Sequence, residues 1–391
     1  FMQGIVFGIL FTLCTLVCVK QGIYIYKYGI KGELNYEAKT KLIYDTLEEN
    51  YVGEINKEDM FEGMYLGMVL NTTDRYSTYI PASAYGDFKQ SISGEYVGIG
   101  VVVNINENNN VEIKYVFEGS TAEEAGILPG DIIVSVDEVE ATAENYEDIV
   151  ELVKGVEGTV VKLKLYRPEQ ALTMTKEVER AKVDTPTVSC TMLEDKIGYI
   201  RISEFDGVTY DQFKAGLDDL TSQGMEKLIV DLRDNPGGLL TSVSDVLDEF
   251  LDEGVITYTE NKAGEREYEY SSEGSLDIPV AVMVNGGSAS AAELFTAAMQ
   301  DRADADVIGE NTYGKGVVQT TIPFSDGSAL KLTTSRYYTP NGVCIDGVGV
   351  KPDYEISAYP DFEMPYLDNS KAEFAENDIQ LEKALEVIKN K

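Results

Sequence analysis

The fold of this chain is indicated most clearly by residues 280–300, VAVMVNGGSASAAELFTAAMQ. Lys315 follows fifteen residues later, in the phrase GKGVVQ. Five consecutive apolar residues at 280–284 predict a buried strand, and the glycines after them predict a turn. Residues 290–300 then show apolar side chains at helical spacing. The stretch therefore predicts one strand–turn–helix unit, with Ser290 at the first turn of the helix.

A second stretch repeats this pattern earlier in the chain. LIVDL at 228–232 predicts a buried strand, RDNPGG at 233–238 a turn, and residues 239–251 a helix with a 3.6-residue apolar period. A further short strand is expected at 306–309. Two strand–turn–helix units in succession indicate an α/β core.

Both glycine-rich turns lie where a strand gives way to a helix, a place suited to stabilising negative charge. Free backbone N–H groups and the positive end of the helix dipole meet there. We expect Ala291 to offer one N–H beside Ser290, and the Gly237–Gly238 turn to offer a second. The 391 residues contain no histidine, which excludes a Ser-His-Asp triad and a histidine-ligated zinc hydrolase. An activated Ser290 must therefore have another base.

Lys315 is the best-placed candidate for that base. An ordinary lysine, with a pKa of about 10.4, is almost wholly protonated at pH 7, but burial lowers the pKa of an ammonium group. Lys315 sits in an uncharged stretch that suits burial, and Gln319, four residues on, is expected on the same face of a strand, where it would orient the lysine. Taken singly, Gly-Lys-Gly also fits an exposed turn, and Ser290 also fits a helix cap.

Between the N-terminal region and the α/β core lies a β-rich segment. Its expected elements are a strand at 97–103, a turn at 104–110, strands at 111–116 and 132–136, a helix at 146–153 and a closing strand at 160–166. The order of VGIG before a strand and LPGD before a later one resembles a PDZ domain over residues 93–170. A small β domain without a ligand is the alternative.

The resemblance to a PDZ domain implies a peptide site. The N–H groups of Val97, Gly98, Ile99 and Gly100 would hold the carboxylate of a protein C-terminus, and the following strand would pair with the extended peptide. Arg167, at the end of the last strand, is read either as a reporter of that contact or as an exposed surface arginine.

Several phrases in order resemble the carboxyl-terminal processing peptidases, PDZ-containing serine proteases. These are TDRYSTYI (73–80), DLRDNPGG (231–238), VNGGSASAAE (284–293), GKGVVQ (314–319), TPNGVCIDGVGVKPD (339–353) and DIQLEKALE (378–386). The resemblance implies a crotonase-like protease core, with neither metal nor cofactor. It implies that Ser290 is the nucleophile, Lys315 the general base and Gln319 its orienting partner. Ala291 with a glycine of the NPGG turn, Gly237, would form the oxyanion hole. Ala292 departs from a small polar residue common in the family.

The first residues predict a membrane anchor. Met2–Val19 is an uncharged, almost wholly apolar run of 18 residues, about 27 Å long as a helix, which suffices to cross a bilayer. No clear cleavage site follows, so an uncleaved anchor is favoured over a removed signal peptide. The lysines after the run would favour a cytoplasmic protease side. The resemblance implies the opposite, with the PDZ and protease parts outside the cytoplasm.

Other features bound the partners. A net charge of −36 argues against nucleic acid. Helices expected at 36–50 and 57–70 have an apolar face that suits either plain packing or a homodimer. Cys190 and Cys344 are open to pairing in an oxidising compartment or to remaining free thiols.

The expected domains are a transmembrane anchor at 1–28, an N-terminal helical region at 36–90, a PDZ domain at 91–175, a serine protease core at 181–357 and a C-terminal helical segment at 358–391. Together they predict a membrane-anchored serine endopeptidase that recognises protein C-termini. A catalytically silent PDZ adaptor is the first alternative. A hydratase-like enzyme is the second, but it would need paired acidic residues at the reacting centre and no PDZ domain.

Overall fold

The computed structural model describes Thr15 and residues 35–358, 364–365, 372, 374 and 377–391. The predicted membrane span at 2–19 lies outside these residues, apart from Thr15. Among the helices in the described part of the chain, none is both long and apolar enough to cross a membrane. The chain divides into two compact units after Thr72.

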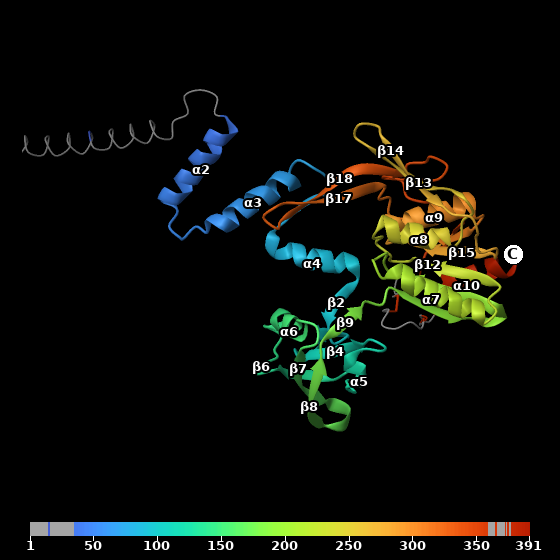
Figure 1. The fold of residues 1–391 in the computed structure, drawn as a ribbon, viewed down its shortest axis with the longest axis horizontal. Coiled ribbons are helices and arrows are strands. Elements are labelled where there is room, and N and C mark those ends of the chain that lie inside the picture. Colours follow the sequence, from blue (N-terminus) through green and yellow to red (C-terminus); the bar gives the residue numbers. More distant parts are fainter. Residues whose placement is uncertain (1–14, 16–34, 359–363, 366–371, 373, 375–376) are drawn as a thin grey trace, which may run out of the picture. The chain divides into compact units, whose positions relative to one another are not determined.

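Residues 35–72 of the first unit contain α2 (Tyr36–Asn50) and α3 (Lys57–Leu70), as the sequence predicts (Figure 1). Each begins at an asparagine whose side chain accepts a hydrogen bond from a first-turn N–H: Asn35 from Ala38 and Asn56 from Glu58. Neither helix has a buried residue, so their apolar side chains remain at the surface of this unit.

The second unit contains the PDZ-like part and the protease core (Figure 1). Its helices are α4 (Ala82–Ser93), α5 (Thr121–Glu124), α6 (Tyr146–Val153), α7 (Thr209–Ser222), α8 (Leu240–Asp248), α9 (Ala291–Arg302) and α10 (Ile379–Lys389). Its strands are β1 (Thr78–Ile80), β2 (Glu95–Gly98), β3 (Val101–Ile105), β4 (Val111–Val116), β5 (Ile132–Val136), β6 (Val139–Glu140), β7 (Val160–Arg167), β8 (Leu172–Glu179), β9 (Ala181–Asp184), β10 (Val188–Met192), β11 (Ile197–Ile202), β12 (Lys227–Asp231), β13 (Gly254–Asn261), β14 (Arg266–Ser271), β15 (Val280–Val284), β16 (Asp306–Gly309), β17 (Val317–Pro323), β18 (Ala329–Tyr338) and β19 (Tyr354–Glu355).

The core is a six-stranded sheet in the order β10-β11-β12-β15-β16-β19. All neighbours pair in parallel except β10 and β11, which are antiparallel. The two strand–turn–helix units predicted from sequence are therefore β12 with α8 and β15 with α9. Because β12 and β15 are parallel neighbours, their carboxyl ends meet at one edge of the sheet. That edge is where open α/β sheets bind ligands.

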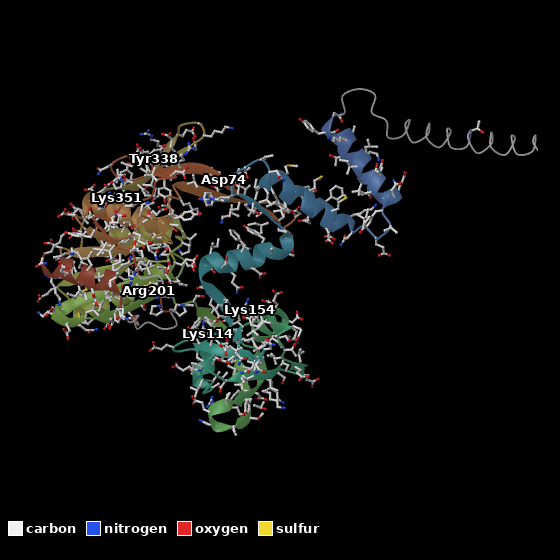
Figure 2. All side chains as sticks on the ribbon, turned by 180° about the vertical axis from the view of Figure 1, so that it is seen from behind. Asp74, Lys114, Lys154, Arg201, Tyr338 and Lys351 are labelled. Atoms are coloured by element: carbon white, nitrogen blue, oxygen red, sulfur yellow. The ribbon has the colours of Figure 1, made fainter. Side chains whose placement is uncertain are left out.

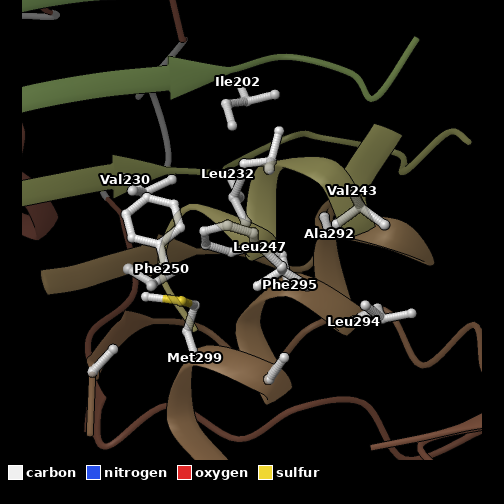
Figure 3. Close-up of a cluster of buried hydrophobic side chains, with 14 of the residues drawn as sticks. Ile202, Val230, Leu232, Val243, Leu247, Phe250, Ala292, Leu294, Phe295 and Met299 are labelled. Carbon is white, nitrogen blue, oxygen red and sulfur yellow. The ribbon is translucent and has the colours of Figure 1, made fainter. Parts of the chain in front are cut away.

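Both faces of this sheet are covered. On one face, side chains from β11, β12 and β15 pack against α7, α8 and α9, with Phe250 and Phe295 near the centre (Figure 3). On the other, Ile229 and Met283 pack against α10. Successive strand residues alternate between the two faces, which explains why the strands read as continuous apolar runs. The α/β prediction is confirmed; the likeness to a crotonase fold stays a prediction.

A buried charge cluster ties α10 to the end of β12. Arg233 makes bidentate hydrogen bonds to Asp231 and to Asp378, at 2.6–3.0 Å, and Tyr199 donates its hydroxyl to Asp231. Burial alone would raise the pKa of Asp231, but the charge and hydrogen bonds of Arg233 lower it overall. Since Arg233 begins the NPGG turn, this cluster fixes where the turn leaves the sheet.

The PDZ-like part has a sheet in the order β3-β4-β5-β7-β8, with β6 paired to β5. Its core contains Ile113, Ile133, Ile149, Leu163 and Leu165. The strands and helix predicted at 111–116, 132–136 and 146–153 are found at those bounds. The segment predicted as one strand at 97–103 is instead two strands, β2 and β3. Gly100, with a φ of 79°, makes the break, because a left-handed residue interrupts an extended strand.

Candidate active site

The two turns at the carboxyl ends of β12 and β15 are bonded to each other. The Ala289 N–H donates to the Asn235 carbonyl at 2.9 Å. The Asn285 amide donates to Asp234 Oδ1 at 2.8 Å, and the Asp234 N–H donates back to Asn285 Oδ1 at 2.9 Å. The sequence predicted these turns separately; the parallel pairing of their strands brings them together.

Ser290 lies between these turns and α9 in an unusual backbone conformation, with φ 54° and ψ −114°. A non-glycine residue at positive φ is uncommon, and such strain gathers at functional sites. The residue is half-buried. Ser290 is therefore a strained residue at a strand-to-helix turn, in the place predicted for a nucleophile.

The predicted oxyanion residues adjoin Ser290. A Cβ on Gly237 would lie 2.7 Å from Ser290 Cβ and 2.9 Å from the Ala291 nitrogen, so only glycine fits. The Ala291 N–H, in the first turn of α9, donates no hydrogen bond within the described residues. The Gly237 N–H donates to Asn235 Oδ1 at 2.8 Å. The two predicted oxyanion donors therefore differ in availability: the Ala291 N–H has no acceptor among the described residues, whereas the Gly237 N–H already donates to Asn235.

A buried carboxylate, Glu293, joins the serine segment to the lysine segment. It is fully buried and lies one helical turn after Ser290. Its Oε2 accepts hydrogen bonds from the N–H groups of Ser290 and Lys315, each at 2.8 Å. The two backbone nitrogens therefore lie less than twice that distance apart. Its Oε1 accepts from Thr312 Oγ1 at 2.6 Å and from the Gly314 N–H at 2.7 Å.

The Tyr337 hydroxyl holds the same two segments at their carbonyl groups. It lies 2.8 Å from the Ser290 oxygen and 2.5 Å from the Lys315 oxygen. Its single proton can satisfy only one carbonyl at a time, or both in a shared bond. Burial raises the pKa of Tyr337 well above its ordinary value, so the hydroxyl stays a donor. Glu293 and Tyr337 together fix the backbone on both sides of the predicted dyad.

The environment of Lys315 favours its neutral form. The side chain is half-buried, and its Nζ lies 5.0 Å from the centre of the Tyr76 ring. The pKa of Lys315 is lowered, first by burial and then by the charge of Lys331, while Glu293 and Asp74 act in the opposite direction. Asp74 comes from the segment that precedes β1 (Figure 2). A lysine with a lowered pKa is the kind of base that a serine without histidine needs.

Gln319 lies in β17, but Lys315 lies outside this strand, so the two are not residues of one strand as expected. Lys315 precedes the strand, which begins at Val317, and a bulge between Val318 and Gln319 shifts the register with β18. The extra residue of this bulge is Thr334 on β18, so the alternation along β17 itself is intact. The Gln319 amide donates to Thr333 Oγ1 at 3.2 Å and reaches the Val317 carbonyl at 3.4 Å.

The predicted carboxylate-binding residues divide into two pairs. Val97 and Gly98 lie in β2 and pair with β9. Ile99 and Gly100, at the turn into β3, line a cavity of about 480 Å³ between β3 and α6. Two of the four predicted residues therefore line a cavity, and the carboxylate site itself stays a prediction.

Arg167 is not an exposed surface residue. It makes a bidentate pair with the buried Asp131, at 2.7 Å to each oxygen, and donates to the Gly126 carbonyl. The expectation of an exposed arginine is therefore wrong, and its contact with a bound peptide stays a prediction. Cys190 and Cys344 are unpaired. In the described part of the chain, no cluster of three or more His, Cys, Asp or Glu side chains could hold a metal ion.

Two groups of site residues escaped the sequence analysis. Glu293 had a local signal, since Ser290 and Glu293 have the spacing of a helix capping box, and the Glu293 side chain does accept from the Ser290 N–H. Tyr76, within the quoted phrase TDRYSTYI, and Tyr337, in β18, had no signal that links them to the dyad, because their contacts with it form only in the folded chain.

Comparison with known proteins defines the class. The model of peptidase family S41 matches residues 196–356, and that of a PDZ domain matches residues 112–167. A probable CtpA-like serine protease of Staphylococcus epidermidis is 35% identical over 338 residues, which is 84% of this chain and 68% of the relative. The carboxy-terminal processing protease CtpA of Bacillus subtilis is 34% identical over 348 residues, 88% of this chain and 74% of the relative.

A solved structure supports the fold. A putative S41 protease from Bacteroides fragilis superposes with a TM-score of 0.53 at 17% identity, over 92% of this chain and 99% of the other. The chain is a serine-type peptidase with a mixed α/β fold and a PDZ domain. It belongs to the carboxyl-terminal processing serine proteases of peptidase family S41, as its sequence phrases predicted.

We expect Glu293→Gln to lower kcat by about 100-fold or more, with little change in KM. The amide nitrogen of glutamine would face two of the four donors that the carboxylate accepts, so Ser290 and Lys315 would move apart, and a shift of about 1 Å at a reacting centre costs about that factor. Steady-state cleavage of an unstructured protein measures it, with thermal unfolding as the fold check and the exposed Glu273→Gln as the control. An unchanged kcat in a folded variant would show that Glu293 does not position the dyad.

Proposed function

We propose that this carboxyl-terminal processing protease cleaves peptide bonds with a Ser290–Lys315 dyad. The observation that supports it best is the shared Glu293 oxygen, which holds the backbone N–H groups of both residues. The lowered pKa of Lys315 supports its role as the base. Gln319 is assigned a supporting role near the lysine through its bond to Thr333.

The proposed reaction proceeds in two halves. Neutral Lys315 takes the proton of the Ser290 hydroxyl, and Oγ attacks the carbonyl carbon of the substrate. The developing oxyanion is stabilised by the Ala291 N–H and by an N–H of the Gly237 turn. The C–N bond then breaks, and Lys315 returns its proton to the leaving amine. Water, deprotonated by Lys315, releases the acid and restores Ser290.

We further propose that the PDZ domain presents the substrate. β3 is an edge strand that pairs only with β4 among the described strands, so a peptide can add to it. The cavity beside it has an apolar floor that includes Val101, Val150 and Val153. Such a groove suits an apolar C-terminal residue whose carboxylate faces the Ile99–Gly100 turn.

Replacing either member of the dyad tests the enzyme. We expect Ser290→Ala and Lys315→Ala each to abolish cleavage of an unstructured protein to the background rate, while the unfolding temperature stays close to that of the parent. Lys351→Ala, far along the chain from the dyad, serves as the control and should cleave normally. Retained cleavage in either dyad variant would refute the mechanism. Peptide binding without cleavage by the parent chain would favour the silent adaptor.

We also propose that the N-terminal helices form a homodimer contact. Exposed large apolar side chains gather on α2 and α3: Ile43, Leu47, Phe61, Met64, Tyr65, Leu66, Met68 and Leu70. Apolar surface of this extent on a small unit usually serves an interaction. In sedimentation velocity we expect the parent to be a dimer, Phe61→Asp with Met64→Asp to be a monomer, and Lys39→Gln to be a dimer. A monomeric parent would refute the contact.

The membrane anchor remains part of the proposal. Residues 2–19 are apolar and uncharged for the length of a bilayer core. We propose that they anchor the chain in the cell membrane with the PDZ domain and protease outside the cytoplasm. The full chain should stay with membranes after alkaline carbonate extraction, and a chain that starts at Tyr36 should be released. Protease added to intact spheroplasts should digest the PDZ and protease parts of the anchored chain. Extraction of the full chain by carbonate would rule out the anchor.

A further inference from the structure

The cavity between β3 and α6 has a second wall that does not belong to the PDZ domain. Glu204 and Asp206, from the loop between β11 and α7, line it together with Gly94 and Glu95. The loop is held there by backbone contacts, because the Gly207 N–H donates to the Ile92 carbonyl at 3.3 Å. A Cβ on Gly94 would lie 3.1 Å from Asp206 Cβ. The protease core thus contributes two acidic residues to the peptide groove.

Asp206 is unusual for a buried carboxylate. The residue is 5% exposed, yet within the described part of the chain its carboxylate accepts no hydrogen bond and forms no ion pair. Its backbone N–H donates to Thr209 Oγ1 at 2.9 Å, which orients the loop but leaves the carboxylate unpaired. Neither of its oxygens is among the described side-chain atoms that are both fully buried and unpaired, so the carboxylate opens into the cavity, where a ligand can reach it.

The pKa values of Asp206 and Glu204 reflect the lack of a cation beside them. Burial, with a smaller contribution from Glu204, raises the pKa of Asp206 to about 7. Glu204 is itself exposed, but neighbouring protein removes enough water to raise its pKa as well. A positive charge between the two would reverse both effects.

The charge of the cavity lining favours a basic side chain of a bound peptide over an acidic one. Its charged lining residues are Asp87, Glu95, Glu204, Asp206 and Lys154. Lys154, at the end of α6 (Figure 2), already pairs with Glu151 at 3.0 Å, and Glu95 pairs with Lys182 at 2.9 Å, so the acid pair Glu204 and Asp206 is the part of the lining that can attract a cation. An entering ammonium or guanidinium group would meet a partly desolvated carboxylate without a cation, whereas an acidic side chain would meet like charge.

We propose that Glu204 and Asp206 form a specificity subsite that receives a lysine or arginine side chain of the peptide bound in the groove. The apolar floor takes the C-terminal residue, and the acid pair selects a basic residue a short way before it. This assignment rests on the proposed role of the PDZ groove and adds a substrate class to it. The protease would then prefer chains whose C-terminal tail is apolar at its end and basic just upstream.

Fluorescence anisotropy with the full chain carrying Ser290→Ala tests the subsite without cleavage of the probe. The probes are labelled peptides with an apolar C-terminus, in which lysine, norleucine or glutamate is scanned through the positions before the last residue. We expect the best lysine peptide to bind about tenfold more tightly than its norleucine equivalent, as for a hydrogen bond to a charged group, and the glutamate peptide to bind most weakly. Added salt should narrow the difference.

Variants locate the effect. Asp206→Asn and the exposed Glu204→Gln should each reduce the lysine preference, and Glu138→Gln, on an exposed turn of the PDZ domain, should leave it intact. Glu204→Gln keeps the test valid should Asp206→Asn fail to fold. Equal binding of lysine and norleucine at every position, or tighter binding of glutamate, would overturn the subsite while the groove itself stands. If C-terminal amidation leaves binding unchanged, or no peptide binds, the groove is not a C-terminus reader and both proposals fail.

Discussion

One buried carboxylate sets the geometry of the candidate site. Glu293 is enclosed by the core and surrounded by four donors from two segments of chain. A buried carboxylate with its lone pairs satisfied is stable, and one that loses donors is costly. The α9 helix and the loop before β17 are therefore locked in one relative position. Ser290 lies at the start of α9 and Lys315 lies in the loop before β17. Because Glu293 accepts hydrogen bonds from both backbone N–H groups, it fixes the separation of the two backbones, although it does not contact the reacting hydroxyl or amine.

The sheet places this arrangement where substrate can reach it. Parallel pairing of β12 with β15 brings the glycine turn and the strained serine to one edge. The buried ion pairs of Arg233 with Asp231 and Asp378 fix the start of the glycine turn that follows β12. At the same time, the core loop carrying Asp206 reaches the PDZ groove. The protease core therefore shapes both the candidate site and one wall of the groove proposed to bind the substrate.

Local patterns in the sequence predicted the helices and strands well, but they predicted poorly which distant residues come into contact. The helices of the first unit, β5, α6 and β16 follow from apolar spacing and turn residues, since those signals are local. The dyad and the Gly237 turn were predicted because each sits in a distinctive phrase. The split at Gly100 was missed, since it depends on a single residue that interrupts a regular period. Tyr337 and Asp206 carry no local signal, because burial and sheet pairing alone give them their roles.

The most direct test of the account is the rate at which a fluorophosphonate modifies Ser290, followed by peptide mass spectrometry as the pH is raised. This reaction needs neither a substrate nor the PDZ groove, so it reports only whether the serine is activated. The proposed dyad makes the neutral lysine the base, and its pKa is lowered, so the proposal predicts that the rate rises with pH and levels off below the ordinary lysine pKa. Lys331→Gln removes a like charge, raises the pKa of Lys315 and should shift that rise to higher pH. Lys315→Ala should abolish the labelling. Equal labelling of Ser290 in the parent and in Lys315→Ala would contradict the dyad.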